Sequence, residues 1–129
     1  MSKGRFGRYG GQFVNEMLMP VLIELEEAWD KHYPLESFQK ELDKLLRTYA
    51  GRPTPLYHAA NFSDEIGCKV YLKREDLVCG GSHKLNNTLG QALLTKRMGK
   101  KRMITETAAG QHGLATAMVG RVCNIETEV

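Results

Sequence analysis

The stretch KVYLKREDLVCGGSHKLNN, residues 69–87, joins a strand-like segment to the start of a helical pattern through two adjacent glycines. Residues 69–73 predict a strand, and the apolar residues Leu85, Leu89 and Leu93 recur at helical spacing from residue 83 onward. A strand that passes into a helix is the repeating unit of α/β folds. The stretch also places Lys84 at a helix start, where backbone N–H groups already attract anions.

The alternation of strand and helix continues to residue 129. Residues 102–107 predict a second strand, residues 110–123 a helix of small side chains, and residues 125–129 the beginning of a third strand. Strands that alternate with helices form parallel sheets with right-handed crossovers, and such sheets carry helices on both faces. We therefore predict an α/β fold with a parallel three-layer βαβαβ sheet.

Two amphipathic helices are expected before this part, over residues 15–33 and 37–50. Asn15 suits a helix cap, and the two prolines within residues 51–59 favour an extended chain there. We predict a helical N-terminal arm over residues 1–51 and an α/β part that binds cofactor and substrate over residues 52–129. Because residue 129 stands inside an apparent strand, which leaves a sheet edge unpaired, we expect a fragment of a longer chain.

Composition argues against several classes of protein. Hydrophobic residues make up 42% and charged residues 26% of the 129 residues, as in ordinary globular domains, and no apolar run approaches the roughly 20 residues of a membrane span. The net charge is +3, and its dense patch at residues 96–102 lacks the aromatic partners typical of nucleic-acid binding. Three cysteines without a C-x-x-C pair predict no metal site and favour a reducing cytoplasm.

Two loops carry the residues with the clearest chemical potential. Lys84 comes after the first predicted strand and Glu106 stands at the carboxyl end of the second, 22 positions apart, so we expect both at the sheet edge where open α/β folds bind ligands. A helix start disfavours an ammonium, which makes the Lys84 amine a better nucleophile for a Schiff base. Each residue alone has a plain explanation: a surface lysine, a turn histidine at His83, a carboxylate at a helix start. Together they favour a cofactor site.

Five segments resemble the tryptophan synthase beta chain family. They are GRFGRYGGQFVNE (4–16), GRPTPLYHA (51–59), VYLKREDL (70–77), GGSHKLNNTLGQALL (80–94) and ETAAGQHGLATA (106–117). The resemblance covers almost the whole chain and implies a pyridoxal 5′-phosphate lyase of fold type II that condenses L-serine with indole to L-tryptophan. It also implies an alpha chain and a second beta chain as partners, and a monovalent cation in the full-length enzyme.

The resemblance assigns roles to residues of both loops. Lys84 would hold the cofactor covalently and move the serine α-proton, and Glu106 would be the acid/base group for the β-hydroxyl and for indole attack. His83, Asn86 and Gln111 would lie beside the cofactor, with His83 toward its phosphate. The backbone of one continuous segment would bind the substrate carboxylate: Thr107, Ala108, Ala109, Gly110, Gln111 and His112.

Three positions depart from the family pattern. Asn15 replaces a common proline, Ser82 a usual alanine and Ala108 a usual glycine. If residue 108 needs a positive φ, its Cβ costs roughly 1 kcal/mol and weakens the grip on serine. The family chain also continues beyond residue 129, and the glycine-rich phosphate site, the partner of the pyridine nitrogen and the cation ligands are expected in that later part.

Two alternatives stay open at this stage. One is another pyridoxal-phosphate enzyme that catalyses β-replacement or elimination on serine or threonine. The intact ETAAGQHG block at residues 106–113 argues against it, because the block includes the carboxylate tied to indole chemistry. The other is a truncated, non-catalytic fragment.

Overall fold

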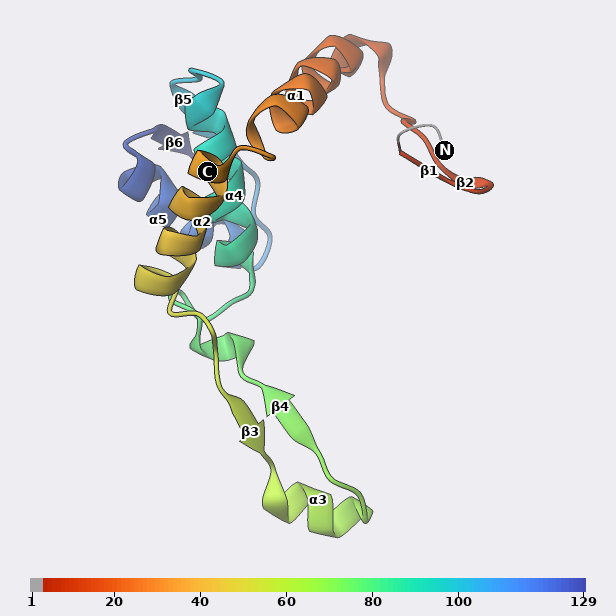
Figure 1. Cartoon of the computed structure of the whole chain (residues 1–129), viewed down its shortest axis with the longest axis vertical. Coiled ribbons are helices and arrows are strands. Elements are labelled where there is room, and N and C mark those ends of the chain that lie inside the picture. The colour runs from red at the N-terminus through yellow and green to blue at the C-terminus, as the bar shows by residue number, and fades with distance from the viewer. Residues whose placement is uncertain (1–3) are drawn as a thin grey trace.

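The computed structural model describes residues 4–129 (Figure 1). The helices are α1 (Met19–His32), α2 (Glu36–Thr48), α3 (Ala60–Ile66), α4 (Lys84–Arg97) and α5 (Gln111–Cys123), with short 3-10 helices η1 (Glu16–Leu18) and η2 (Glu75–Leu77). The strands are β1 (Arg5–Phe6), β2 (Tyr9–Gly10), β3 (Leu56–His58), β4 (Tyr71–Lys73), β5 (Arg102–Ile104) and β6 (Glu126–Glu128). All four longer helices were predicted from the sequence, whereas α3 was not.

The core lies between α2, α4 and α5, which pack side by side in Figure 1. Phe38 of α2, Leu89 of α4 and Val119 of α5 are fully buried in it. The stripe predicted for α4 is therefore confirmed as its buried face. Phe38 and Ala50, both within the predicted N-terminal arm, belong to the same core as α4 and α5. One core therefore extends across residue 51. The division of the chain near that residue stays a prediction.

The predicted three-stranded parallel sheet is wrong for its first strand. β5 and β6 are parallel and joined through α5, with Ile104 opposite Glu128, which confirms one βαβ unit. β4 instead pairs antiparallel with β3, with Leu56 opposite Lys73, in a separate two-stranded sheet. The extended segment of residues 51–59 lies close to β4 in sequence and offers free backbone groups. Pairing with it satisfies the backbone hydrogen bonds of β4 at a smaller entropic cost of loop closure than pairing with a more distant strand.

β3 and β4 project from the helical body as a long two-stranded arm with α3 at its tip (Figure 1). Ser63 ties the tip together, because its buried hydroxyl donates to the Ala59 carbonyl and accepts from the Val70 amide. Gly67 ends α3 at a φ of +71°. A seven-residue helix of this kind has too few apolar repeats to show a clear period in sequence.

The helical segment formed by η1 and α1 begins with the predicted Asn15 cap, but the apolar stripe of α1 is incompletely buried. The Asn15 side chain accepts a hydrogen bond from the Met17 amide at 2.9 Å, and Pro20 lies in the first turn of α1, where no N–H is needed. The apolar stripe that includes Val21 and Leu25 remains 59% and 44% exposed. Within residues 4–129, therefore, this stripe has no complete cover.

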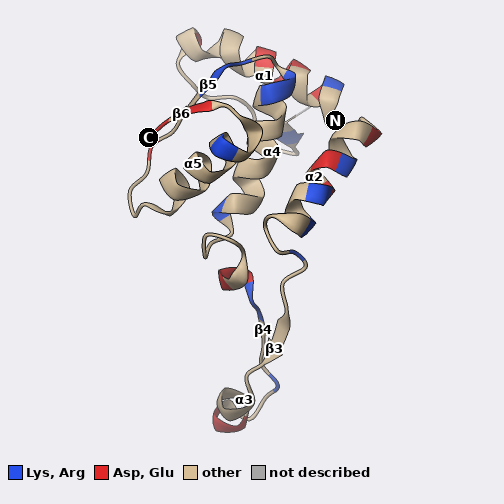
Figure 2. Ribbon diagram, turned by 90° about the vertical axis from the view of Figure 1, so that its left-hand side faces the viewer, with Lys and Arg blue, Asp and Glu red and all other residues tan. Residues whose placement is uncertain are grey.

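The basic patch at residues 96–102 is largely neutralised by neighbouring helices. Arg97 pairs with Glu41 of α2 at 2.8 Å, and Lys100 pairs with Glu24 of α1 at 2.6 Å. Basic and acidic side chains also alternate along α2 (Figure 2). The patch is thus a charged helix end, and Gly99 follows the helix with a φ of +71°. No helix among residues 4–129 is both long and apolar enough to cross a membrane.

Candidate active site

Two glycines reverse the chain before α4. Gly80 and Gly81 have φ values of +87° and +75°, in a region of backbone conformation that residues other than glycine rarely adopt. Gly80 also lies against α5, since a Cβ built on it would come within 3.3 Å of the Met118 sulfur. The turn lets α4 begin at Lys84, as predicted.

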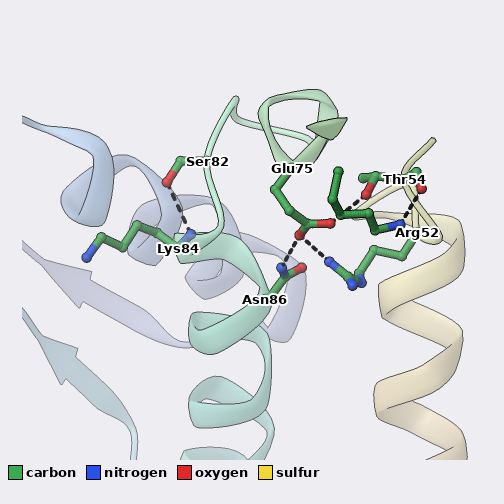
Figure 3. A network of polar contacts seen from close by, with 7 residues as sticks. Arg52, Thr54, Glu75, Ser82, Lys84 and Asn86 are labelled. Atoms are coloured by element: carbon green, nitrogen blue, oxygen red, sulfur yellow. Dashed lines mark hydrogen bonds and ion pairs between the residues drawn. The ribbon is translucent and has the colours of Figure 1, made fainter. Parts of the chain in front are cut away.

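Lys84 is half-buried in the first turn of α4. Its backbone N–H donates to the Ser82 hydroxyl at 3.1 Å, so Ser82 caps one of the helix's free donors. Figure 3 shows the Lys84 side chain extending away from the polar network on the other side of the helix start. Its Nζ forms no hydrogen bond or ion pair with any other of residues 4–129, and His83 beside it is exposed. The described part of the chain therefore leaves this amine without a partner.

The second predicted loop follows β5 and opens α5, also as predicted. Glu106 is exposed, and Gly110 precedes the helix with a φ of +90°. Gln111, the first residue of α5, is exposed as well. The expectation that Lys84 and Glu106 share one parallel sheet edge rested on β4 joining β5, so that argument fails with the strand pairing.

Thr107 packs directly against the first turn of α5. A Cβ on Gly113 would approach the Thr107 Cγ2 to 2.9 Å and a Val129 methyl to 2.7 Å, so this position admits only glycine without rearrangement. The Thr107 hydroxyl and the His112 Nδ1 are buried without a hydrogen-bond partner among the described residues. A buried polar group without a partner costs about 1–3 kcal/mol, so both atoms suit a bound polar ligand.

Ala108 is not strained. Asn124 is the one non-glycine residue with a positive φ among residues 4–129, so the backbone at 108 accommodates a Cβ. The condition under which we expected a weaker grip on serine, a positive φ at residue 108, is therefore not met.

The predicted residues do not all line one hollow. His112 lines a cavity of about 390 Å³ between α1, α4, β5 and α5, together with Thr88 and Thr105. Asn86 lines a larger, open cavity of about 850 Å³, whose walls come mainly from α1, α2 and α4. Asn86 and His112 thus line different cavities.

A carboxylate that the sequence did not single out lies next to the start of α4. Glu75 accepts hydrogen bonds from the Thr54 hydroxyl at 2.5 Å, from Arg52, and from the Asn86 side-chain amide at 3.1 Å (Figure 3). These bonds, the one from Thr54 foremost, hold the pKa of Glu75 below its usual value. Lys73 adds a hydrogen bond to the Thr54 carbonyl. Since the partners stand 11 to 23 positions from Glu75, no local sequence pattern reveals them.

Metal ligation finds no support among the described residues. No group of three or more His, Cys, Asp and Glu side chains lies close enough together there to hold a metal ion. Cys68 and Cys79 are exposed, Cys123 is buried, and all three are free thiols. Burial raises the pKa of the Cys123 thiol, which keeps it protonated.

Comparison with known proteins identifies the family. A family described as pyridoxal-phosphate dependent enzymes matches residues 47–129, more than half of the chain. The chain is also 61% identical over 127 residues to tryptophan synthase beta chain 1 of Methanosarcina acetivorans, a match that covers 98% of this chain and 32% of the relative. The chain thus spans about a third of the length of the curated relative it matches. It belongs to the family of pyridoxal-phosphate dependent enzymes.

Proposed function

We propose that this chain supplies the lysine-bearing part of a lyase that condenses L-serine with indole to form L-tryptophan. The observation that carries the proposal is the 61% identity to a tryptophan synthase beta chain, which extends over 98% of this chain. That span includes the Lys84 turn and the whole loop from Glu106 to Gly113.

The described residues fit the family's cofactor. Lys84 offers a half-buried amine that has no partner within residues 4–129, and Thr107 and His112 each hold a buried polar atom without a hydrogen-bond partner in the same range. Pyridoxal phosphate, when bound, supplies an aldehyde for a Schiff base and a ring that accepts electrons. Lys84 would hold it covalently, His83 would face its phosphate and Gln111 would lie beside it. The helix start adds favourable partial charge for the phosphate.

Each residue of the two loops then has a defined task. Lys84 takes the serine α-proton on Nζ and later returns a proton to the product. Glu106, exposed at the end of β5, protonates the departing β-hydroxyl and then accepts the proton that indole loses. Backbone N–H groups of residues 107–112 bind the serine carboxylate, since Gly110 turns this segment toward a helix start. The proposal places no chemical step on Asn86.

The proposal extends to partners and setting. An alpha chain and a second beta chain would complete the assembly, and a monovalent cation would bind residues outside this chain. The alpha chain is proposed because the relative is named a beta chain, and a beta chain implies a differently named companion. A cytoplasmic location suits a biosynthetic enzyme with three free thiols.

An activity assay on the complete protein tests the function. With pyridoxal phosphate, L-serine and indole, we expect L-tryptophan, and we expect Lys84→Ala to abolish it. Lys69→Ala is the matched control, since Lys69 is an exposed lysine just before β4. Product from L-serine or L-threonine without any use of indole would instead identify an elimination enzyme. No turnover with any of these substrates would contradict the proposal.

A further inference from the structure

We propose that Glu75 is a positioning residue for Lys84, acting through the Asn86 amide. The proposal rests on the proposed function, in which Lys84 holds the cofactor. It replaces the expectation that Asn86 touches the cofactor: Asn86 instead fixes the helix turn that carries Lys84.

The first step is the chemistry of the Glu75 network. An ionised carboxylate only accepts hydrogen bonds, and Glu75 receives three donors from two segments of the chain. Thr54 and Arg52 come from the extended segment before β3, and Asn86 comes from the first turns of α4. The side chain of Glu75 is 30% exposed and Thr54 is only 4% exposed, so solvent screens these bonds incompletely. Glu75 therefore joins α4 to a separate, extended part of the chain.

The second step is the orientation of the Asn86 amide. Because Glu75 accepts only, the Nδ2 of Asn86 must face it, at 3.1 Å. The Oδ1 of the same amide is buried without a partner among the described residues. No hydrogen bond to Oδ1 therefore orients the Asn86 amide among the described residues, and the bond from Nδ2 to Glu75 does.

The third step is helix geometry. Residues two apart in a helix point about 200° away from each other. Figure 3 shows this arrangement: Asn86 faces Glu75, and Lys84 leaves the opposite side of the same turn. A bond that fixes the rotation of the helix at Asn86 therefore fixes the direction of Lys84 as well.

The fourth step is the need for such a bond. α4 begins after Gly80 and Gly81, which have more backbone freedom than other residues, and the His83 side chain does not cap it. Ser82 holds one N–H of the first turn. Helix ends fray unless side chains or tertiary contacts hold them. Glu75 supplies the tertiary contact at the turn where the amine must be placed.

The test compares three variants in the complete protein. Glu75→Gln keeps the shape of the side chain but replaces one carboxylate oxygen with an NH₂ group, which faces the donors that Glu75 accepted from. Asp76→Asn is the control, because Asp76 is the neighbouring carboxylate and its side chain pairs with Arg74 at the surface, outside the Glu75 network. The double variant Glu75→Gln with Asn86→Asp reverses the polarity of the pair, so that Gln donates to Asp while one carboxylate remains.

Two readouts separate positioning from stability. Pyridoxal phosphate is added, borohydride traps the Schiff base at timed intervals, and mapping gives the rate of labelling at Lys84, corrected for the folded fraction. A misplacement of about 1 Å can cost on the order of 10²-fold in rate, so we expect Glu75→Gln to slow labelling by about 10- to 100-fold. Amide hydrogen exchange over residues 84–88, without cofactor, should become faster in the same variant.

The expected pattern is slow labelling and fast exchange in Glu75→Gln, values near those of the unsubstituted protein in Asp76→Asn, and recovery in the double variant. A Glu75→Gln protein that melts earlier yet labels as fast as Asp76→Asn overturns the proposal. If Glu75→Gln does not fold, the double variant decides: folding with labelling still about 100-fold slow also overturns it. No label on Lys84 in the unsubstituted protein contradicts the proposed function, and the exchange data then decide whether Glu75 orders the helix start.

Discussion

Residues 82 and 108 show how far single substitutions can be interpreted from sequence. The resemblance places Ser82 where the family usually has alanine, and Ala108 where it usually has glycine. The Ser82 hydroxyl accepts from the Lys84 N–H at 3.1 Å, and the backbone of Ala108 has no positive φ. The residue types were visible in the sequence, but the effect of each depended on a backbone conformation that the sequence does not specify.

The exposed position of Glu106 leads to a prediction about its role in catalysis. Glu106→Gln removes the proton-transfer group but keeps the size of the side chain. Because general acid–base groups contribute about 10²- to 10⁴-fold, we expect the rate of L-tryptophan formation in the complete protein to fall by that factor. The cofactor absorbance should stay unchanged, since Lys84 is intact. A variant with unaltered turnover would show that the carboxylate is structural.

Elements with a strong local pattern were predictable, and long-range pairings were not. The predicted helices at residues 15–33, 37–50 and 110–123 correspond to α1, α2 and α5, and the helical pattern predicted from residue 83 onward corresponds to α4. The pairing of β4 with β3 was missed, because a three-residue strand carries no sign of its partner. The Glu75 network was missed for the same physical reason: hydrogen bonds between distant residues leave no periodic signal.

The packing of α5 leads to a prediction about two glycines in helices. A Cβ at Gly113 would be 2.7 Å from Val129 and 2.9 Å from Thr107, so Gly113→Ala should lower the free energy of unfolding by about 1–3 kcal/mol. Gly90 in α4 is the matched control, since nothing lies within 4 Å of its Cβ position. Gly90→Ala should raise the same free energy by about 0.5–1 kcal/mol. Urea unfolding of both variants gives the comparison, and equal effects would contradict the close packing of α5.

The contact between η2 and α4 leads to a prediction about pH. The pKa of Glu75 lies below its usual value near 4.5, chiefly because Thr54 and then Arg52 and Asn86 hydrogen-bond its ionised form. The resulting stability is fully present above about pH 4.5 and is lost as the pH falls through the lowered pKa of the folded state. The difference in melting temperature between the unsubstituted protein and Glu75→Gln should therefore be largest above pH 4.5 and shrink below it.

Asp76→Asn provides the comparison for this pH experiment. Arg74 also lowers the pKa of Asp76, but the Asp76 side chain is 57% exposed, so solvent screens its ion pair more strongly. Its effect on the pH profile should be smaller than that of Glu75→Gln. A difference for Glu75→Gln that does not change with pH would show that its carboxylate is not held by the network.

The whole molecule exposes much apolar surface. Phe13, Met17 and Ile104 are 84%, 83% and 72% exposed, and β5 and β6 form a sheet of only two strands with open edges. Such surfaces and edges favour association. We expect residues 1–129, expressed alone, to self-associate in light scattering over a dilution series and to form no L-tryptophan. A monomer at all concentrations that turns over serine and indole would contradict this.

The central claim is that Lys84 holds the cofactor. The most direct measurement is borohydride reduction of the complete protein with pyridoxal phosphate, followed by peptide mapping. The free, half-buried amine at the start of α4 predicts one pyridoxyl group, on Lys84. A label on Lys73 or Lys96 with Lys84 unmodified would contradict the account.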